Sequence, residues 1–122
     1  RKAIDYFEKA LKIDREIYGE NHPDVATDYN NLGLAWNALG DSRKAIDYYE
    51  KALKIDREIY GENHPAVATM YNNLGGAWNA LGDSKKAIDY LQRSYKILMH
   101  FYGDNHPHTK SVKEALDYQC KK

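Results

Sequence analysis

Apolar side chains recur every three or four residues between positions 24 and 39, which is the spacing of one face of an amphipathic helix. The members of this apolar stripe are Val25, Tyr29, Leu32, Trp36 and Leu39. Pro23 suits the first turn, because the backbone N–H that proline lacks would have no partner there. Gly40 can adopt the left-handed conformation that ends a helix. The pattern therefore predicts a helix over residues 24–39, which we name helix A.

A second and wider apolar stripe follows after a tight turn and predicts another helix, helix B, over residues 43–60. Its members are Ala45, Ile46, Tyr49, Ala52, Leu53, Ile59 and Tyr60. Either Asp41 or Ser42 caps its start, and Gly61 ends it. The polar segment GENHP then connects helix B to the next helix A. The unit is thus two antiparallel helices followed by a short loop.

This helix pair repeats with a period of 42 residues. Residues 1–42 and 43–84 are identical at 38 of 42 positions. The four differences are Phe7/Tyr49, Asp24/Ala66, Asp28/Met70 and Leu34/Gly76. A third copy begins at Lys85 and loses the pattern after Pro107. A fixed period of this length predicts a solenoid, because two helices cannot bury their apolar faces alone and neighbouring units must share a core.

We therefore expect a single repeat domain over residues 1–122. Its parts are a helix B at 1–18, complete units at 24–60 and 66–102, and a C-terminal capping helix at 108–121. Close packing of helix A on its partner is expected at the small residues Ala26, Gly33 and Ala45, with Trp36 and Tyr49 filling the remaining space.

The two ends of the array are predicted to differ. In the last helix, the positions of the core stripe have become largely polar and hold Thr109, Lys113, Leu116 and Cys120. A terminal repeat needs such an outer face for solubility, and the residues expected to face inward are Val112, Ala115 and Leu116. The first helix lacks its own helix A, so we expect a partly bare apolar stripe of Ile4, Phe7 and Leu11. This bare stripe predicts self-association through the uncapped N-terminal helix, and a first residue other than Met indicates a piece of a longer array.

Charge and composition narrow the choice of partners. The chain has 18 basic and 18 acidic residues, so no strong field attracts nucleic-acid phosphates or anionic lipid. No apolar run approaches the roughly 20 residues of a membrane helix, and the start has no signal-peptide form. Sparse cysteine usage, Cys120 alone, suits a reducing compartment. We expect an intracellular, cytoplasmic protein that binds neither nucleic acid nor membrane.

The repeated positions resemble the signature of the tetratricopeptide repeat. They carry, in order, Tyr29, Leu32, Gly33, Trp36, Ala45, Tyr49 and Ala52. The 42-residue period and the His-Pro-x-Val-Ala start resemble the longer repeats of kinesin light chain, although the near-identity of the units departs from them. The resemblance implies an all-α fold, a right-handed superhelical solenoid of antiparallel helix pairs with about six helices. It also implies a non-catalytic scaffold for protein–protein interaction.

A peptide ligand would occupy the concave face, which in such a superhelix is lined mainly by A helices. The candidate groove residues are those outside the core stripe: Thr27, Asn30, Asn31, Leu34, Asn37, Thr69, Asn72, Asn73, Gly76 and Asn79. By resemblance, Asn31 and Asn73 occupy the position of an asparagine that hydrogen-bonds the ligand backbone. The change from Leu34 to Gly76 predicts a side-chain pocket above Gly76, suited to an apolar or aromatic anchor.

Purely structural roles are open to several of the recurring residues. The asparagines are equally expected to bond helix ends or neighbouring helices, since buried amides rarely go unpaired, or merely to solvate one face of the helix. The recurring histidines, His22, His64 and His106, are expected in caps and turns, because units about 10 Å apart cannot share a metal ion. The recurring tyrosines at the ends of B helices, Tyr18, Tyr60 and Tyr102, are expected in the core and at interfaces. We expect Cys120 to be a packing residue, and we expect no catalytic residue, metal or cofactor.

Two functions therefore remain. The first is a binding module that presents its asparagine-rich groove to a peptide segment of a partner protein, which Asn31 and Asn73 favour. The alternative is a structural spacer or self-assembling array without a dedicated peptide ligand. Near-identical units favour this alternative, because a specific groove normally diversifies.

Overall fold

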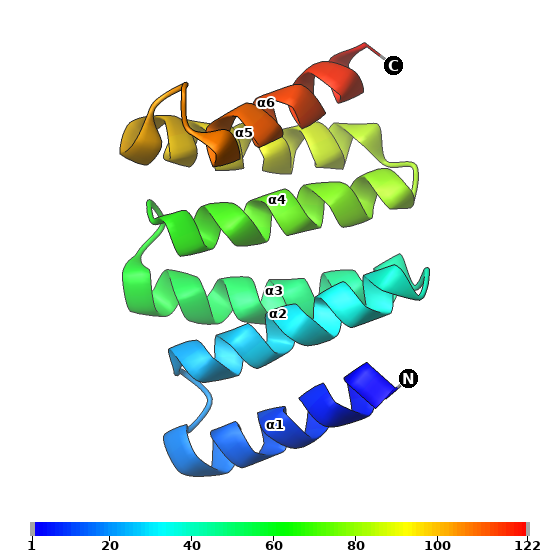
Figure 1. Cartoon of the computed structure of the whole chain (residues 1–122), viewed down its shortest axis with the longest axis vertical. Coiled ribbons are helices and arrows are strands. Elements are labelled where there is room, and N and C mark those ends of the chain that lie inside the picture. The colour runs from blue at the N-terminus through cyan, green and yellow to red at the C-terminus, as the bar shows by residue number, and fades with distance from the viewer. Residues whose placement is uncertain (1, 122) are drawn as a thin grey trace.

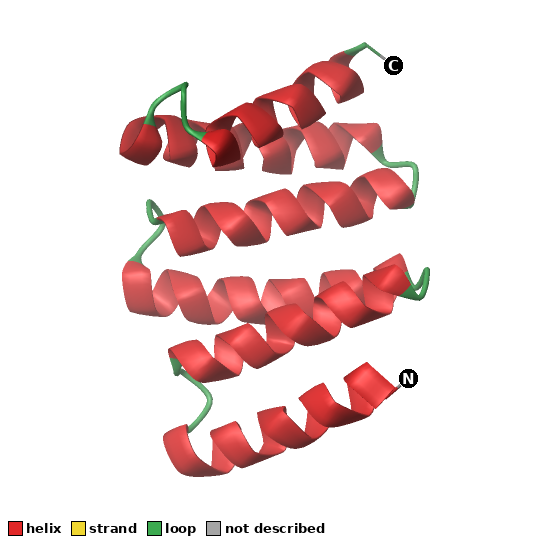
Figure 2. Cartoon of the chain, in the orientation of Figure 1, coloured by secondary structure: helices red, strands yellow, loops and turns green. Residues whose placement is uncertain are grey.

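The computed structural model describes residues 2–121, and these residues fold into six helices without a strand (Figures 1 and 2). The helices are α1 (Lys2–Tyr18), α2 (Pro23–Ala38), α3 (Ser42–Tyr60), α4 (Pro65–Ala80), α5 (Ser84–Tyr102) and α6 (Pro107–Cys120). The all-α prediction is confirmed, and α2 to α6 each begin one residue before the predicted start. Arg1 and Lys122, which the predicted domain includes, lie outside the described residues.

The helices stack in chain order, and each packs against the next along the chain. Figure 1 shows α3 and α5 lying behind α2, α4 and α6, with the two termini at opposite ends of the stack. The A helices are thus α2, α4 and α6, and the B helices are α1, α3 and α5. One face of the stack is therefore formed by A helices, as expected for a helix-pair solenoid.

The helix ends use the residues that the sequence marked for them. Pro23 occupies the first turn of α2, and Asp41 rather than Ser42 caps α3 by accepting a hydrogen bond from the backbone N–H of Lys44 at 3.1 Å. Gly40 has a φ of 88°, a conformation that side chains disfavour. These local rules recur in every unit and fix the direction of each successive helix.

Small residues let the paired helices approach closely, as predicted. Ala26 and Ala45 are buried, and the ring of Tyr49 packs directly on Gly33. A Cβ atom at Gly33 would lie 2.5 Å from Tyr49 Cε1, a distance that van der Waals packing does not allow. Glycine is therefore required here by the neighbouring ring.

Three predicted members of the apolar stripes lie outside the core. Leu39 at the C-cap of α2 is 53% exposed, and Ile59 and Tyr60 are also exposed. Both lie in the last turn of α3, where the ring of Tyr60 stacks on His64 of the following loop instead of entering the core. Ile55 and Asp56 are buried in that part of α3 instead.

The predicted partly bare stripe of α1 is right for two of its three residues. Phe7 and Leu11 are only partly buried, whereas Ile4 is buried in the core, because this face of α1 contacts the following helix, α2. The exposed apolar residues of α1 are Tyr6, Ile13 and Ile17. Two of their counterparts 42 residues later are covered on α3, since Ile55 is buried and Tyr48 packs against the core, whereas no described helix precedes α1.

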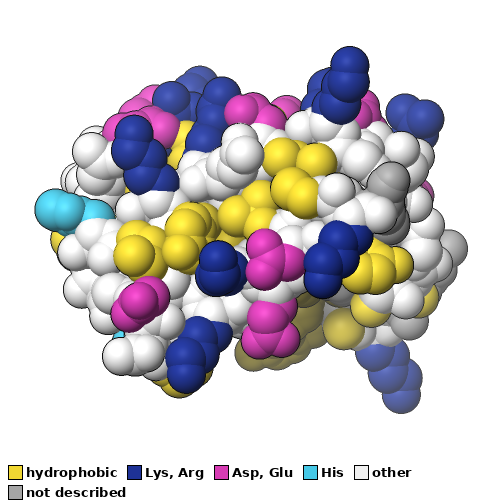
Figure 3. Space-filling view, turned by 90° about the horizontal axis from the view of Figure 1, so that it is seen from above, with side chains coloured by type: hydrophobic (Ala, Val, Ile, Leu, Met, Phe, Trp, Pro, Cys, Tyr) yellow, Lys and Arg dark blue, Asp and Glu magenta, His cyan; other side chains and the backbone are white. Residues whose placement is uncertain are grey.

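At the other end, α6 buries Thr109, Val112, Leu116 and Gln119. Val112 and Leu116 were expected to face inward, whereas Cys120 is exposed, so its prediction as a packing residue is wrong. Figure 3 views this end of the molecule and shows apolar side chains in a broken stripe between charged ones. The outer face is therefore mixed rather than uniformly polar.

Candidate binding groove

The ten predicted groove residues lie on α2 and α4, outside the buried core. The exposed ones are Thr27, Leu34, Asn37, Thr69 and Gly76. The half-buried ones are Asn30, Asn31, Asn72, Asn73 and Asn79. They lie along one side of the A helices. Some of their side chains are hydrogen-bonded within the chain and others are not.

Two of the asparagines bond each other across the repeat boundary. The Nδ2 atom of Asn73 on α4 donates a hydrogen bond to Oδ1 of Asn30 on α2 at 2.8 Å. Bonding between neighbouring helices, one of the roles that the sequence left open for the asparagines, is confirmed for this pair. In residues 2–121 no hydrogen bond is made by the side chains of Asn31 and Asn72, which leaves these amides open to a ligand.

Several other groove side chains are bonded locally. The hydroxyl groups of Thr27 and Thr69 donate to the carbonyl oxygens of Pro23 and Pro65, at 3.0 and 3.2 Å. Each hydroxyl therefore faces the groove as an acceptor. Asn37 Oδ1 accepts a hydrogen bond from Ser42 at 3.1 Å, so this asparagine supports the turn between α2 and α3.

Two hollows lie at the N-terminal ends of the A helices, and they are equivalent by the repeat. The first groove pocket has a volume of about 250 Å³ and lies between α2, α3 and α4, with Thr27, Asn30, Asp56 and Tyr60 among its lining residues. The second groove pocket, about 350 Å³, lies between α4, α5 and α6, with Thr69, Asn72, Leu98 and Tyr102 at the matching positions.

The expected pocket above Gly76 is not one of these hollows. A Cβ atom at Gly76 would meet nothing within 4 Å, so this residue lies on open surface. The hollows lie instead where a B helix reaches the groove between two A helices. Asp56 and Leu98 were not predicted as site residues. Asp56 lies three residues after Leu53 of the apolar stripe, and a charged residue at such a buried position could have indicated a site.

Burial changes the acid–base properties of two aspartates. Asp56 is 8% exposed, and burial raises its pKa to about 6. Asp28 is 7% exposed; burial, and then the neighbouring Asp14 carboxyl group, raise its pKa well above the usual value. Both carboxyl groups therefore resist ionisation more than exposed ones do.

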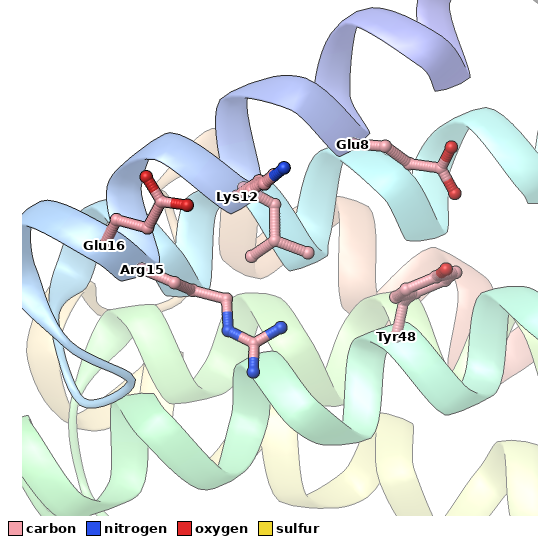
Figure 4. Close-up of a pocket in the computed structure, with 6 residues that line it drawn as sticks. Glu8, Lys12, Arg15, Glu16 and Tyr48 are labelled. Carbon is pink, nitrogen blue, oxygen red and sulfur yellow. The ribbon is translucent and has the colours of Figure 1, made fainter.

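Two further hollows lie between successive B helices. The first is lined by Glu8, Leu11, Lys12, Arg15, Glu16 and Tyr48. Figure 4 shows Arg15 extending from α1 towards α3 and Tyr48 rising from α3. The same six positions one unit later line the second of these hollows, between α3 and α5. Each hollow is lined by two acidic and two basic side chains, and Arg15 is paired with Glu20 at 2.8 Å.

The recurring histidines cap A helices, as the sequence predicted. His64 Nδ1 accepts the backbone N–H of Ala66 at 3.0 Å, and His22 and His106 do the same in their units. The ring of Tyr60 stacks on His64 at a centroid distance of 4.2 Å, and Tyr18 and Tyr102 stack in the same way on the other two histidines. These tyrosines are exposed, so their prediction as core residues is wrong.

Two structural features are absent from residues 2–121. No group of three or more His, Cys, Asp and Glu side chains in this range is arranged to hold a metal ion. No helix in the same range is long and apolar enough to cross a bilayer.

The comparison with known families agrees with this architecture. The tetratricopeptide repeat model matches residues 1–58 and 37–100, which together span most of the chain. The chain belongs to the tetratricopeptide repeat family. Its long repeats are of the kinesin-light-chain-like variety. Tetratricopeptide repeats serve as protein-interaction scaffolds, and the family is generally non-catalytic.

Solved structures show the same fold. The crystal structure of BtubC (BKLC) from P. vanneervenii matches with a TM-score of 0.90 and 30% identity, over 98% of this chain and 48% of that one. A putative kinesin light chain from Podosopora anserina with nearly identical TPR-like repeats matches with a TM-score of 0.88 and 20% identity, over 97% of this chain and 56% of that one. The chain thus spans about half the length of both. No curated protein matches the sequence.

Proposed function

We propose that the chain is a binding module that holds an extended peptide segment of a partner protein along its A helices. The observation that carries this proposal is the recurrence of the groove pockets, one in each unit, at the 42-residue period. Each combines apolar walls with a few polar groups, the usual composition of a ligand site. The family supports a protein partner.

The open amides supply the contacts to the peptide backbone. Asn72 lines the second groove pocket, and a free amide can donate to a backbone carbonyl group and accept from a backbone N–H. Asn31 on α2 lines neither groove pocket, and we propose it as a second open amide for the peptide backbone. Asn30 and Asn73 have a different role, because their hydrogen bond joins α2 to α4 and keeps the two pockets in register.

Capture of a random peptide pool on the immobilised chain tests this function. The groove variant is Asn31→Ala combined with Asn72→Ala, and we expect it to lose most of the captured peptides. The matched control is Glu50→Ala combined with Lys54→Ala, in the hollow between α3 and α5, and it should retain them. Equal capture by both variants would show that the groove amides do not bind peptide.

A structural spacer remains the second candidate, because residues 1–42 and 43–84 differ at only four positions. Uniform units extend a rod without needing a ligand. This function predicts that the unaltered chain enriches no peptide from the pool over a blank surface. Enrichment that depends on Asn31 and Asn72 contradicts the spacer function.

A further inference from the structure

The first and second groove pockets differ in chemistry at one wall. Asp56 and Tyr60 of α3 line the first, and Leu98 and Tyr102 of α5 occupy the equivalent positions in the second. Both pockets have a tyrosine at the second of these positions. At the first position, the carboxyl group of Asp56 is replaced by the isobutyl side chain of Leu98. The two pockets occupy equivalent positions in successive units, and this one difference lets them select different side chains of a peptide.

Asp56 is a buried acid without a partner. It is 8% exposed, and in the part of the chain that the structure describes its carboxyl group makes no hydrogen bond or ion pair. No Lys or Arg lines the first groove pocket. A carboxylate in such a place loses part of its solvation and gains no hydrogen bond in return, and the raised pKa of Asp56 reflects that loss. The pocket therefore presents an acidic wall that no basic side chain of the described residues neutralises.

We propose that the first groove pocket binds a lysine or arginine side chain of the peptide through Asp56, while the second groove pocket binds an apolar side chain against Leu98. This inference rests on the proposed function and names the class of peptide that the groove selects. Both the charged end and the apolar stem of a basic side chain suit the first pocket. The charged end pairs with Asp56, and the methylene groups lie along the exposed ring of Tyr60.

The spacing of the pockets sets the spacing of the two peptide residues. The bond between Asn73 and Asn30 shows that α2 and α4 lie within side-chain reach of each other, so we take the pockets to be on the order of 10 Å apart, close to the spacing of packed helices. A polyproline II segment returns to the same face every three residues and advances about 9 Å in doing so. On this spacing, a peptide in that conformation would reach both pockets with residues three positions apart, which is the spacing used in the test peptides.

Binding of a small cation tests the first pocket directly. The probe is ethylguanidinium, added to the intact chain, with ethylurea as a neutral compound of similar shape. The carbon NMR signal of the Asp56 carboxyl group is followed from pH 4 to pH 8. We expect ethylguanidinium to lower the midpoint of this titration from about 6 towards the usual value, because a nearby cation favours the carboxylate. Ethylurea should leave it unchanged, and an equal effect of both compounds, or of neither, overturns the inference.

Reciprocal variants test the selectivity with peptides. The paired probes are synthetic peptides that have lysine or norleucine at one position and leucine three positions away. Asp56→Asn keeps the size of the side chain, and it should weaken binding of the lysine peptide about tenfold or more. Leu98→Asp should give the second pocket a preference for a base. Asp56→Leu gives the first pocket the leucine of the second, and it replaces Asp56→Asn if that variant fails to fold. An unchanged preference for the lysine peptide in the Asp56 variant contradicts the inference.

The outcomes separate this inference from the proposed function. Peptides that bind through Asn31 and Asn72 without any preference for a basic residue leave the function intact and overturn the inference. A chain that enriches no peptide, yet binds ethylguanidinium at Asp56, loses the proposed function and keeps a cation-selective pocket. The two experiments therefore fail independently.

Discussion

The side chain of Asn73 donates a hydrogen bond to Asn30 at 2.8 Å, and this bond joins two consecutive A helices that are 43 residues apart in the chain. Asparagine is a poor helix former, and the hydrogen bond offsets the cost of placing one inside each helix. The bond is half-buried, and it ties the first groove pocket to the wall of the second. Its loss should therefore affect the stability of the stack as well as the groove.

Asn73→Ala should lower the free energy of unfolding by about 0.5 to 1.5 kcal/mol, the usual net value of one hydrogen bond. Asn72→Ala on the same turn is the matched control and should have little effect, because its amide makes no bond within residues 2–121. Urea denaturation measures both. Equal destabilisation by the two variants would show that the bond between Asn73 and Asn30 contributes nothing specific.

The two kinds of glycine on the A helices should respond oppositely to alanine. Gly33→Ala forces a methyl group into the ring of Tyr49, and overpacking of this kind costs about 1 to 3 kcal/mol. Gly76→Ala adds its methyl group to open space and should stabilise the helix by about 0.5 to 1 kcal/mol. Thermal melting of both variants gives the comparison, and a lower melting temperature for Gly76→Ala would contradict it.

Much of the fold could be predicted because each local rule recurs in each unit. Pro23, Gly40 and Gly61 mark helix ends through backbone geometry alone, so their effect does not depend on distant contacts. The role of Gly33 also followed from the sequence, since a glycine opposite an aromatic residue on a partner helix indicates close packing. Errors in the helix bounds were therefore about one residue.

The groove pockets could not be predicted, since each is formed by three helices. Asp56 lies on a B helix, and the sequence does not show that this helix reaches the groove between two A helices. The same limit explains the error at α1. Its two apolar faces look alike in the sequence, and only the packing shows that Ile4 lies inside and Ile13 outside.

Self-association through α1 remains a prediction, now placed on the exposed face of Tyr6, Ile13 and Ile17. We expect the chain to form dimers at high concentration, because contiguous apolar surface favours association. Ile13→Lys should shift the chain to monomer in sedimentation equilibrium. The control is Leu39→Lys, which charges an apolar residue that is exposed to about the same degree on α2. A wild-type chain that stays monomeric contradicts the prediction.

Stability should depend on pH through the buried Asp28. Burial and the nearby Asp14 carboxyl group raise its folded-state pKa above the unfolded value of about 3.8, so the folded state holds a proton that the unfolded state releases. The resulting contribution to stability is complete below pH 4 and is lost as pH rises through the folded pKa. Asp56 adds a similar loss between about pH 4 and pH 6.

Asp28→Met should therefore stabilise the chain at pH 7.5, by about 1 to 3 kcal/mol, the usual cost of an unsatisfied buried polar group. Methionine is the residue at this position one unit later, Met70, where it is buried. The gain should shrink towards pH 4, because Asp28 is then protonated in the folded state and increasingly protonated in the unfolded state as well. Asp47→Met, at an exposed position of α3, controls for the loss of one negative charge. Urea denaturation from pH 4 to pH 8 measures the difference, and a gain from Asp28→Met that is constant across this range would contradict a raised pKa of Asp28.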